Sequence, residues 1–418
     1  MLVELLIRNY KSLRDVRLHN LPAFSVMVGA NASGKSNFVD ALDFLSVISR
    51  SGLAAAVRAK GGYENICFRK MRRSKAGIEF DLTARLPMAS SAGRRLVGLL
   101  EFRYSFGFRA TTEAFATDYK VTHERLTMTL SDSTAPDVEV ARRGEEPPLV
   151  KVSDKAARGG LLPPGDFLER FVKHATLPED ELLWPSRLAD LSPFRRLSQF
   201  LGGCRVYQIS PEMARKPGIP ERSPEVGRHG ENLPAAIEFL KRNRKEAFEE
   251  LVSHVKHAVS TLDHIETRYV ETKELGLFFK ERGVGKPWYA HDVSDGTLKT
   301  VAMFLPVVDP RVTIVAIEEP ENCLHPWILR HFIEVCKAHS GSKQVFLTTH
   351  SPVAVDDVPI DSLFMVRRSG GQTQIERVDT LFPEARQVIA EELFGLGQYW
   401  DSGAIGAVPE PEAHLPSE

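Results

Sequence analysis

The sequence has no apolar run long enough to cross a bilayer. A membrane-spanning helix needs roughly 18 or more consecutive apolar residues, and every hydrophobic stretch here is interrupted sooner. The opening residues 1–15 reach charged side chains too early for a secretory signal peptide. These two absences predict a cytoplasmic protein with no membrane partner.

Cysteine is scarce, and neither sign of charge dominates. The four cysteines are scattered, without a CxxC pair, which predicts a reduced protein with neither disulfides nor a structural zinc site. The 54 basic and 55 acidic residues give a net charge of −1, so only local clusters could bind nucleic acid. A composition of 43% hydrophobic and 26% charged residues is typical of globular proteins. At 418 residues, more than one lobe is expected.

The order of local patterns predicts an α/β fold. Apolar segments typical of buried strands lie at 2–7, 24–28, 312–317 and 344–349. Alternating segments between about 76 and 152 predict half-exposed antiparallel strands. Residues 166–202 and 233–262 look helical, and the Pro- and Gly-rich stretch 211–232 between them reads as a loop. We find neither an internal repeat nor a sustained heptad.

The segment after the second strand carries the strongest motif. Residues 29–36, GANASGKS, match the Walker A pattern GxxxxGK(S/T), with a strand before it and a helical pattern after it. The glycines let backbone N–H groups turn toward a phosphate, and the helix N-terminus adds positive potential. Lys35 would reach the β- and γ-phosphates of ATP, and Ser36 would bind Mg²⁺.

Two later strands end in residues that suit ATP hydrolysis. Strand 314–317 runs into Glu318 and Glu319, as in a Walker B motif, where one carboxylate serves Mg²⁺ and the next polarises the attacking water. Strand 344–349 is followed by His350, which could contact the γ-phosphate. Each feature alone also suits an ordinary solvated strand end or a structural histidine.

A Ser-Asp-Gly sequence precedes the Walker B strand. Ser294 is a good helix N-cap, and Gly296 permits close backbone approach, so the helix that starts here could bind an anion. A plain capped helix is the alternative reading of the same residues.

The order Walker A, Ser-Asp-Gly, Walker B and histidine resembles the ATPase head of the ABC superfamily. Within it, the chain looks like the soluble branch of chromosome-maintenance heads, RecF and, above all, the overcoming-lysogenization-defect (OLD) ATPases. The opening 7–13, IRNYKSL, and the string 318–326, EEPENCLHP, are similar to that branch. The resemblance implies a P-loop head with a mixed sheet, an antiparallel β subdomain and a helical insertion. It also implies a homodimer that sandwiches two ATP molecules.

The resemblance assigns roles by position. Glu318 would be the Mg²⁺ carboxylate together with Ser36, Glu319 the general base and His350 the switch histidine. Ser294 and Gly296 would touch the γ-phosphate of the ATP bound by the partner subunit. The ATP-binding loop would comprise the following residues: Gly29, Asn31, Ser33, Gly34, Lys35, Ser36 and Asn37. No glutamine matches the usual Q-loop convincingly, because Gln208 lies too far along the chain.

The same resemblance suggests how the chain is divided. We expect the head to comprise residues 1–85 and 286–402, with the β subdomain and helical insertion at 86–285 and a flexible acidic tail at 403–418. The middle is too short for the long coiled coil of chromosome-maintenance heads. The segment after His350 has no room for the Toprim nuclease of full-length OLD proteins. We therefore expect an ATPase that works with a separately encoded effector, a nuclease or toxin, in anti-phage defence or DNA repair.

Two other functions remain open at this stage. One is the ATP-binding subunit of a transporter, against which the Ser-Asp-Gly-Thr sequence and the long insertion argue. The other is an ATP-bound scaffold for a toxin or nuclease with little turnover. A basic cluster at 69–75 could contact DNA phosphates or simply solvate a loop; its charged residues are Arg69, Lys70, Arg72, Arg73 and Lys75. A second basic run, 241–245, has the same two readings.

Overall fold

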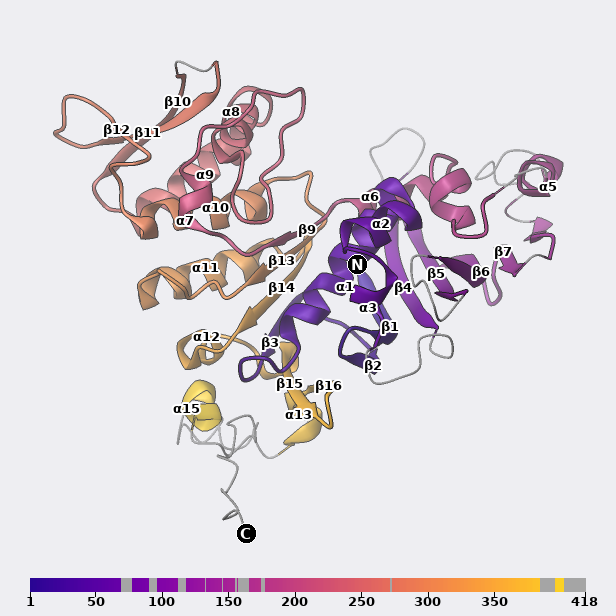
Figure 1. The fold of residues 1–418 in the computed structure, drawn as a ribbon. Coiled ribbons are helices and arrows are strands. Elements are labelled where there is room, and N and C mark those ends of the chain that lie inside the picture. Colours follow the sequence, from indigo (N-terminus) through magenta and orange to yellow (C-terminus); the bar gives the residue numbers. More distant parts are fainter. Residues whose placement is uncertain are drawn as a thin grey trace, which may run out of the picture.

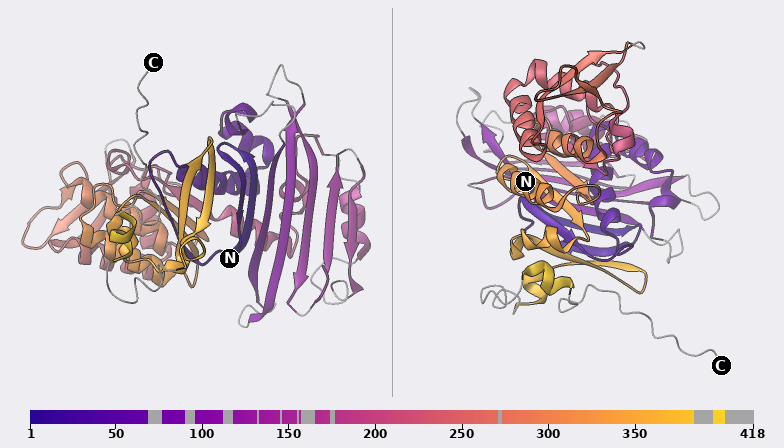
Figure 2. Two further views of the ribbon diagram at one scale, coloured as in Figure 1. Left: turned by 90° about the horizontal axis from the view of Figure 1, so that it is seen from below. Right: turned by 90° about the vertical axis from the view of Figure 1, so that its left-hand side faces the viewer.

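Helix α1 (Lys35–Ser51) lies between two large β-sheets and contacts both (Figure 1). The computed structural model describes residues 1–68, 77–89, 96–111, 118–131, 133–144, 146–154, 156, 165–173, 177–270, 273–383 and 395–401. In Figure 2 the antiparallel sheet and the α8–α11 helices lie at opposite ends of the molecule.

The larger sheet is antiparallel throughout. Its strands, in spatial order, are β2 (Leu13–Leu18), β1 (Leu2–Tyr10), β4 (Ile78–Ala89), β5 (Leu96–Ala110), β6 (Tyr119–Leu130), β7 (Val138–Arg143) and β8 (Leu149–Val152). One face packs on α1, where the rings of Tyr10, Phe44 and Phe80 have centroids 5.3–5.7 Å apart.

The second sheet is mixed and carries the Walker motifs. Its order is β16 (Gln372–Arg377), β15 (Leu363–Ser369), β3 (Phe24–Val28), β14 (Gln344–Thr349), β13 (Ile314–Glu318) and β9 (Cys204–Tyr207). All neighbours are parallel except the β15–β16 pair. β3, β13 and β14 are buried along their whole length, as expected for strands covered on both faces.

Helices cover the mixed sheet on the face opposite α1. A second hydrophobic core lies there, built from this sheet and the helices that follow β9. A small sheet of β10 (Leu262–Tyr269), β11 (Leu275–Glu281) and β12 (Trp288–Tyr289) joins that region.

The helices among the described residues are, in chain order, α1, α2 (Leu53–Ala59), α3 (Tyr63–Ile66), α5 (Gly165–Lys173), the π-helical turn η1 (Trp184–Leu188), α6 (Phe194–Gly202), α7 (Pro211–Ala214), α8 (Leu233–Asn243), α9 (Lys245–Ala258), α10 (Asp295–Val308), α11 (Pro326–His339), α12 (Pro352–Asp356), the 3₁₀ turn η2 (Ile360–Ser362), α13 (Val378–Leu381) and α15 (Leu396–Asp401).

The predicted fold class is confirmed, with some elements added. An α/β head, an antiparallel β region and a helical insertion are all present. The segment 166–202 is helical only in part, since the described residues 177–182 are not in a helix. β9, β10, β11, β12, β15 and β16 had no clear sequence signal. The boundary expected at residue 85 falls inside β4.

The buried side chain of Gln344 joins the two large sheets. Its Oε1 accepts a hydrogen bond from the Leu2 N–H (2.8 Å), and its Nε2 donates to the carbonyl oxygens of Leu2 (2.9 Å) and Pro22 (3.1 Å). The start of β1 is thereby tied to the start of β14, one strand away from the Walker A strand.

Replacing Gln344 with alanine should destabilise the protein. Gln344→Ala leaves the buried N–H and C=O groups of Leu2 without these partners, at a cost of about 1–3 kcal/mol for each group. We expect a clearly lower urea midpoint for this variant. The control is Gln374→Ala on β16, whose side chain is exposed and should change stability little. Equal midpoints for the two variants would contradict the role of Gln344.

Candidate active site

Strand register brings the motif ends to one edge of the mixed sheet. Val28, the last residue of β3, is level with Thr349 of β14, and Glu318 of β13 is level with Thr348. Since these strands are parallel, the residues that follow them emerge at the same carboxyl edge. The Walker A loop, the two glutamates and His350 are therefore brought together.

The Walker A loop is packed too tightly for side chains at two of its glycines. A Cβ on Gly34 would lie 1.9 Å from the Thr373 Oγ1, and one on Gly29 would lie 2.2 Å from the Val366 carbonyl oxygen. Gly34 also has a φ of 111°, a left-handed conformation that strains other residues. Within the described structure, the buried Ser33 Oγ has no hydrogen-bond partner. The loop thus holds a fixed shape with an unsatisfied hydroxyl.

Lys35 is a buried cation that is 6% exposed. Its Nζ donates to the carbonyl oxygens of Gly29 (2.7 Å) and Ala30 (3.0 Å). Burial lowers the pKa of Lys35, while the carboxylates of Glu319, Glu321 and Glu318 act in the opposite direction. A desolvated ammonium group between carbonyl oxygens and carboxylates is suited to an anionic ligand.

The other predicted loop residues face outward or line a neighbouring pocket. Asn31 and Ser36 are exposed, and Asn37 donates through Nδ2 to the Ser12 Oγ (2.6 Å). Asn37 and Ser12 line a pocket of about 410 Å³ beside the loop, together with Lys11, Asn65, Cys67, Phe68, Arg368 and Gly371. A polar pocket beside a phosphate loop is suited to a nucleoside.

Glu318 is almost completely buried and already has a cationic partner. Its Oε1 accepts from the Arg228 guanidinium at 2.7 Å. Arg228 belongs to the loop between α7 and α8, and a second guanidinium nitrogen lies 3.8 Å from Asp40 on α1. The other carboxylate oxygen of Glu318 is not involved in this bond, so the residue can still offer an oxygen to a cation.

Glu319 is held by its backbone in an uncommon conformation. Its φ is 47°, and its N–H donates to the Thr348 carbonyl oxygen (2.9 Å). Its Oε2 accepts from the Asn322 Nδ2 (2.9 Å), and its Oε1 lies 3.9 Å from the His350 Nδ1. The side chain is half-buried, so the carboxylate is fixed yet accessible to water.

His350 is positioned by a third glutamate. The Glu321 Oε1 accepts from the His350 N–H (2.9 Å) and from the Thr349 hydroxyl (2.8 Å), and lies 3.2 Å from the His350 Nδ1. In the described structure the buried Glu321 Oε2 has no hydrogen-bond partner. Glu321 was part of the motif string in the sequence, but a role as the partner of the histidine was not predicted.

Ser294 caps helix α10 and lies beside the loop that follows β13. Its Oγ accepts from the Thr297 N–H (3.2 Å), as its sequence predicted. A Cβ on Gly296 would lie 3.1 Å from the Cys323 carbonyl oxygen, and the buried Lys299 donates to the Glu319 carbonyl oxygen (3.2 Å). The start of α10 is therefore attached to the loop that carries Glu319.

The structure brings Gln208 to the same edge. Gln208 directly follows β9, in which Tyr207 is level with Ile317 of β13. Its side chain is exposed. Our sequence analysis did not assign this residue because it lies too far along the chain from Walker A, and only the pairing of β9 with β13 brings it to this edge. Arg228 was also missed, since its approach to Glu318 depends on the path of a long loop.

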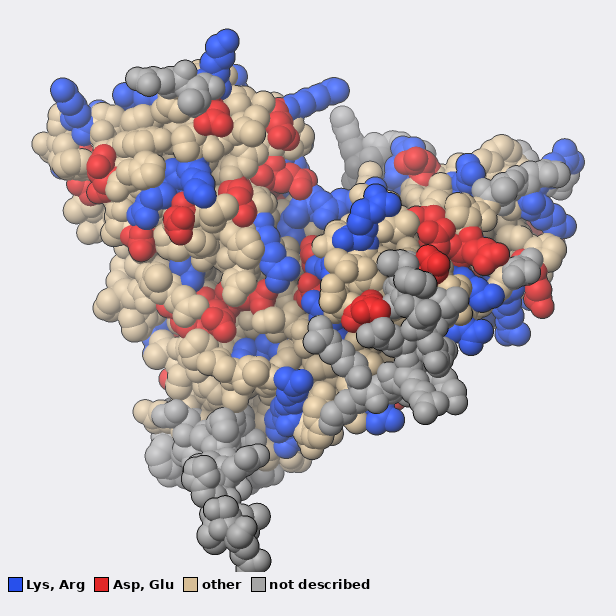
Figure 3. Space-filling model, viewed as in Figure 1, with Lys and Arg blue, Asp and Glu red and all other residues tan. Residues whose placement is uncertain are grey.

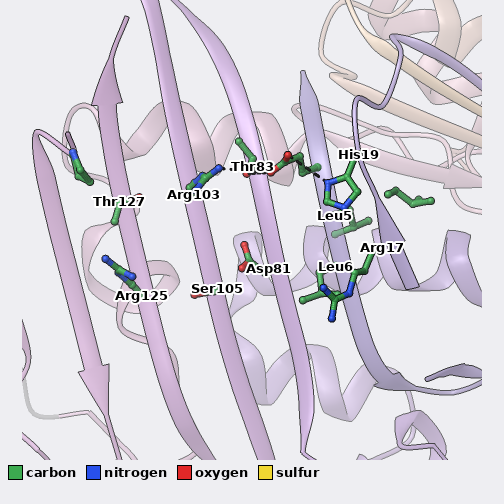
Figure 4. A pocket seen from close by; sticks show the side chains of 13 residues that line it. Leu5, Leu6, Arg17, His19, Asp81, Thr83, Arg103, Ser105, Arg125 and Thr127 are labelled. Carbon is green, nitrogen blue, oxygen red and sulfur yellow. Dashed lines mark hydrogen bonds and ion pairs between the residues drawn. The ribbon is translucent and has the colours of Figure 1, made fainter. Parts of the chain in front are cut away.

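A separate hollow lies on the solvent side of the antiparallel sheet (Figure 4). It measures about 360 Å³ and mixes charges of both signs, with Arg17, Arg103 and Arg125 near Glu4 and Asp81. The predicted nucleotide-site residues are not among those that line it. The hollow is therefore distinct from the candidate active site.

The basic cluster predicted for DNA lies outside the described residues. This applies to all five side chains, Arg69, Lys70, Arg72, Arg73 and Lys75. In the second basic run, Arg242 pairs with Glu238, and Lys245 lies 3.5 Å from Glu249. Acidic and basic side chains are interspersed over the face shown in Figure 3.

Comparison with known families decides the assignment. Residues 24–356 match the family described as "AAA domain, putative AbiEii toxin, Type IV TA system". The chain belongs to this family. The match extends from the Walker A strand to beyond His350, so the candidate site lies within it.

Solved structures give weaker similarities. The SMC head domain from Thermotoga maritima is 14% identical, with 90% of this chain and 98% of that chain covered and a TM-score of 0.40. An SmcHead bound to the C-winged helix domain of ScpA is 12% identical (90% and 96% covered, TM-score 0.49). An Smc head with an extended coiled coil, bound to the C-terminal domain of ScpA derived from Pyrococcus furiosus, is 13% identical (94% and 99% covered, TM-score 0.46). A search of curated proteins returned no match.

Helix length and composition were also compared with the needs of a membrane span. Within the described part of the chain, each helix is too short or too polar to traverse a bilayer.

The Arg228–Glu318 pair provides a test of the prediction that Glu318 binds Mg²⁺. In Arg228→Gln, Glu318 loses its cationic partner, so the ligand-free protein should melt at a lower temperature than the wild type. Added Mg²⁺ and ATP analogue should raise the melting temperature by more in the variant, because Mg²⁺ supplies the missing positive charge.

The matched control is Arg311→Gln. Arg311 pairs with the buried Asp309 at 2.7 Å and is partly buried itself, but Asp309 lies at the end of α10 opposite its capped start. This variant should also lose stability, while its gain on adding nucleotide should equal that of the wild type. An equal gain in Arg228→Gln would count against Glu318 as a metal ligand. Differential scanning fluorimetry provides the measurement.

Proposed function

We propose that this chain is an ABC-type ATPase that hydrolyses ATP and works as a nucleotide-dependent dimeric switch. The observation that carries the proposal is Lys35, which is buried, has only backbone carbonyl partners among the described residues and is influenced electrostatically by three glutamates. A phosphate would satisfy both this cation and the unpartnered Ser33 hydroxyl. The residues present therefore fit ATP and Mg²⁺.

Binding would use the Walker A loop and the pocket next to it. Lys35 and the backbone N–H groups of 29–36 would hold the β- and γ-phosphates, and the nucleoside would lie in the pocket lined by Ser12 and Asn37. The exposed Ser36 hydroxyl and the free oxygen of Glu318 would hold Mg²⁺, which neutralises phosphate charge. Gln208, at the same edge, would add a polar contact beside Glu318.

Hydrolysis would depend on Glu319. Its carboxylate is fixed by the Asn322 amide and is accessible, so it can orient a water and accept its proton. His350 lies within 4 Å of both Glu319 and Glu321, and its position would respond to charge at the γ-phosphate. Glu321 is a positioning residue in this scheme because it holds the histidine backbone and ring.

The exposed Ser294 suggests how two copies would meet. Ser294 and Gly296 lie at the start of a 14-residue helix, where N–H groups and the helix dipole favour an anion. In the proposed homodimer they touch the γ-phosphate bound by the other copy. Two ATP molecules would then hold the copies together, and hydrolysis would release them.

The partners are inferred from chemistry and family. The matched family is described as a putative toxin of a type IV toxin–antitoxin system, a description compatible with a role in anti-phage defence. The separately encoded toxin or nuclease is inferred from the resemblance to OLD ATPases alone. The same nucleotide-dependent switch would also suit a role in DNA repair. The basic segment 69–75 would provide sequence-independent contacts with DNA phosphates.

The first test is ATP binding by Lys35→Ala. We expect loss of measurable heat in calorimetric titration with ATP, because the loop loses its phosphate-binding cation. Lys343→Ala is a matched control: Lys343 is a buried lysine bonded to the carbonyl oxygens of Pro306 and Asp309. It should lose stability but keep ATP affinity. Normal affinity in Lys35→Ala would refute the site.

The second test concerns turnover and dimerisation. Glu319→Gln should lower ATPase activity by several orders of magnitude, yet bind ATP, since the amide cannot accept a proton. In sedimentation velocity this variant should be a dimer with ATP and a monomer without it. Adding Ser294→Arg should prevent the dimer.

The control for that experiment is Glu334→Gln, an exposed glutamate on α11 that pairs with Lys337. It should behave as the wild type in both assays. Dimers that form without ATP and persist in the Ser294→Arg variant would argue against a homodimer that sandwiches two ATP molecules.

A further inference from the structure

Two helices outside the nucleotide site carry an unusual concentration of histidine. His254 lies on α9, while His331 and His339 lie on α11. Glu250 stands one turn before His254 on α9. The family description and the ATPase roles leave this cluster unexplained.

The ligand atoms of the cluster lie close together, joined in the described structure by a hydrogen bond and an ion pair. The Glu250 Oε1 lies 3.0 Å from the His339 Nε2 and 3.8 Å from the His254 Nε2. All three ligand atoms lie within 4.8 Å of one another. Around a tetrahedral Zn²⁺ with bonds of about 2.0–2.1 Å, ligand atoms are separated by about 3.3–3.5 Å. Small side-chain rotations would therefore centre an ion among these three atoms.

A fourth residue supports His254 from behind. The His254 Nδ1 lies 3.3 Å from the His331 Nε2, so the nitrogen facing away from Glu250 has a hydrogen-bond partner. Histidines that bind metals commonly use the second ring nitrogen in this way, which fixes the tautomer and the ring direction. The His254 ring also stacks on Phe304 of α10 at a centroid distance of 5.5 Å.

We propose that Glu250, His254 and His339 form a Zn²⁺ site that joins α9 to α11. Two imidazoles and one carboxylate are a known zinc donor set, with a fourth position left for water. The ligand side chains are between 18% and 42% exposed, so an ion can enter without unfolding. The scattered cysteines led us to expect no structural zinc site, but the fold assembles a donor set that does not use them.

The location gives the site a mechanical consequence. α9 belongs to the insertion and packs beside α10, whose start carries Ser294. α11 begins directly after the loop that carries Glu319 and Glu321. A metal between α9 and α11 would link the insertion to the loop that carries Glu319 and Glu321 and, through the packing of α9, to α10.

The experiment measures Zn²⁺ binding by the full chain. Protein treated with EDTA and desalted is titrated with ZnCl₂ in competition with a chromophoric chelator. We expect one site per chain that is lost in the double variant His254→Ala/His339→Ala. Glu250→Gln should weaken this site by at least about 10-fold, and His331→Ala by about 10–100-fold as the loss of a supporting partner. Co²⁺ should give the visible absorption of a tetrahedral site in the wild type and not in the double variant.

The matched control is His19→Ala. His19 also faces a glutamate, with its Nδ1 3.5 Å from the Glu4 Oε1, but lies near β2 on the antiparallel sheet. Its affinity for Zn²⁺ should equal that of the wild type. Melting curves in EDTA identify variants that fail to fold. If an alanine variant fails to fold, the isosteric Glu250→Gln variant still tests the proposal. The proposal would be overturned if the wild type bound no more Zn²⁺ per chain than the double variant. It would also be overturned if Glu250→Gln and the single variant His339→Ala both kept the wild-type affinity for Zn²⁺.

Discussion

Helix α1 must bury side chains on both of its sides, and the rest of the structure is arranged around that requirement. Phe44 packs against Tyr10 and Phe80 of the antiparallel sheet, while Phe38 packs against Phe346 of the mixed sheet. Each sheet therefore completes its core with the same helix. Because the helix begins at Lys35, its position also fixes where the phosphate loop points. The packing of α1 in the core therefore also determines the geometry of the proposed nucleotide site.

Some of the charged groups at the site have partners within the described chain before any ligand is present. Arg228 faces Glu318, and Lys299 donates to the Glu319 carbonyl oxygen. On the α1 side, Asp40 binds Lys60 at 2.6 Å; burial would raise the pKa of Asp40, but Lys60 and Lys11 outweigh it and lower that pKa. A nucleotide that brings phosphates and Mg²⁺ must exchange some of these partners. The proposed switch therefore has a physical basis in the replacement of internal ion pairs by ligand contacts.

The sequence predicted best the features whose signals are local. The Walker A loop, the glutamates after β13 and the N-cap Ser294 each depend on a few adjacent residues, and strands at 24–28, 312–317 and 344–349 are confirmed because their apolar runs are continuous. Gln208 could not be assigned, since its place depends on β9 pairing with β13 across about a hundred residues. Arg228 and the His254–His339 cluster were missed for the same reason. Tertiary contacts, not spacing, bring those side chains to their partners.

The start of α10 is joined to the loop after β13 by several contacts. Gly296 packs on the Cys323 carbonyl, Lys299 binds the Glu319 carbonyl, and Arg215 ties Asp295 to the loop after α7 at 2.7 Å. Glu319 has a left-handed backbone conformation, which is strained for a residue other than glycine and is maintained by the surrounding loop. In the proposed dimer, a displacement of Ser294 by the second copy would be transmitted through these contacts to Glu319, the proposed general base. Such an arrangement would make the proposed hydrolysis sensitive to whether the partner is in place, which is what a switch that releases its own dimer requires.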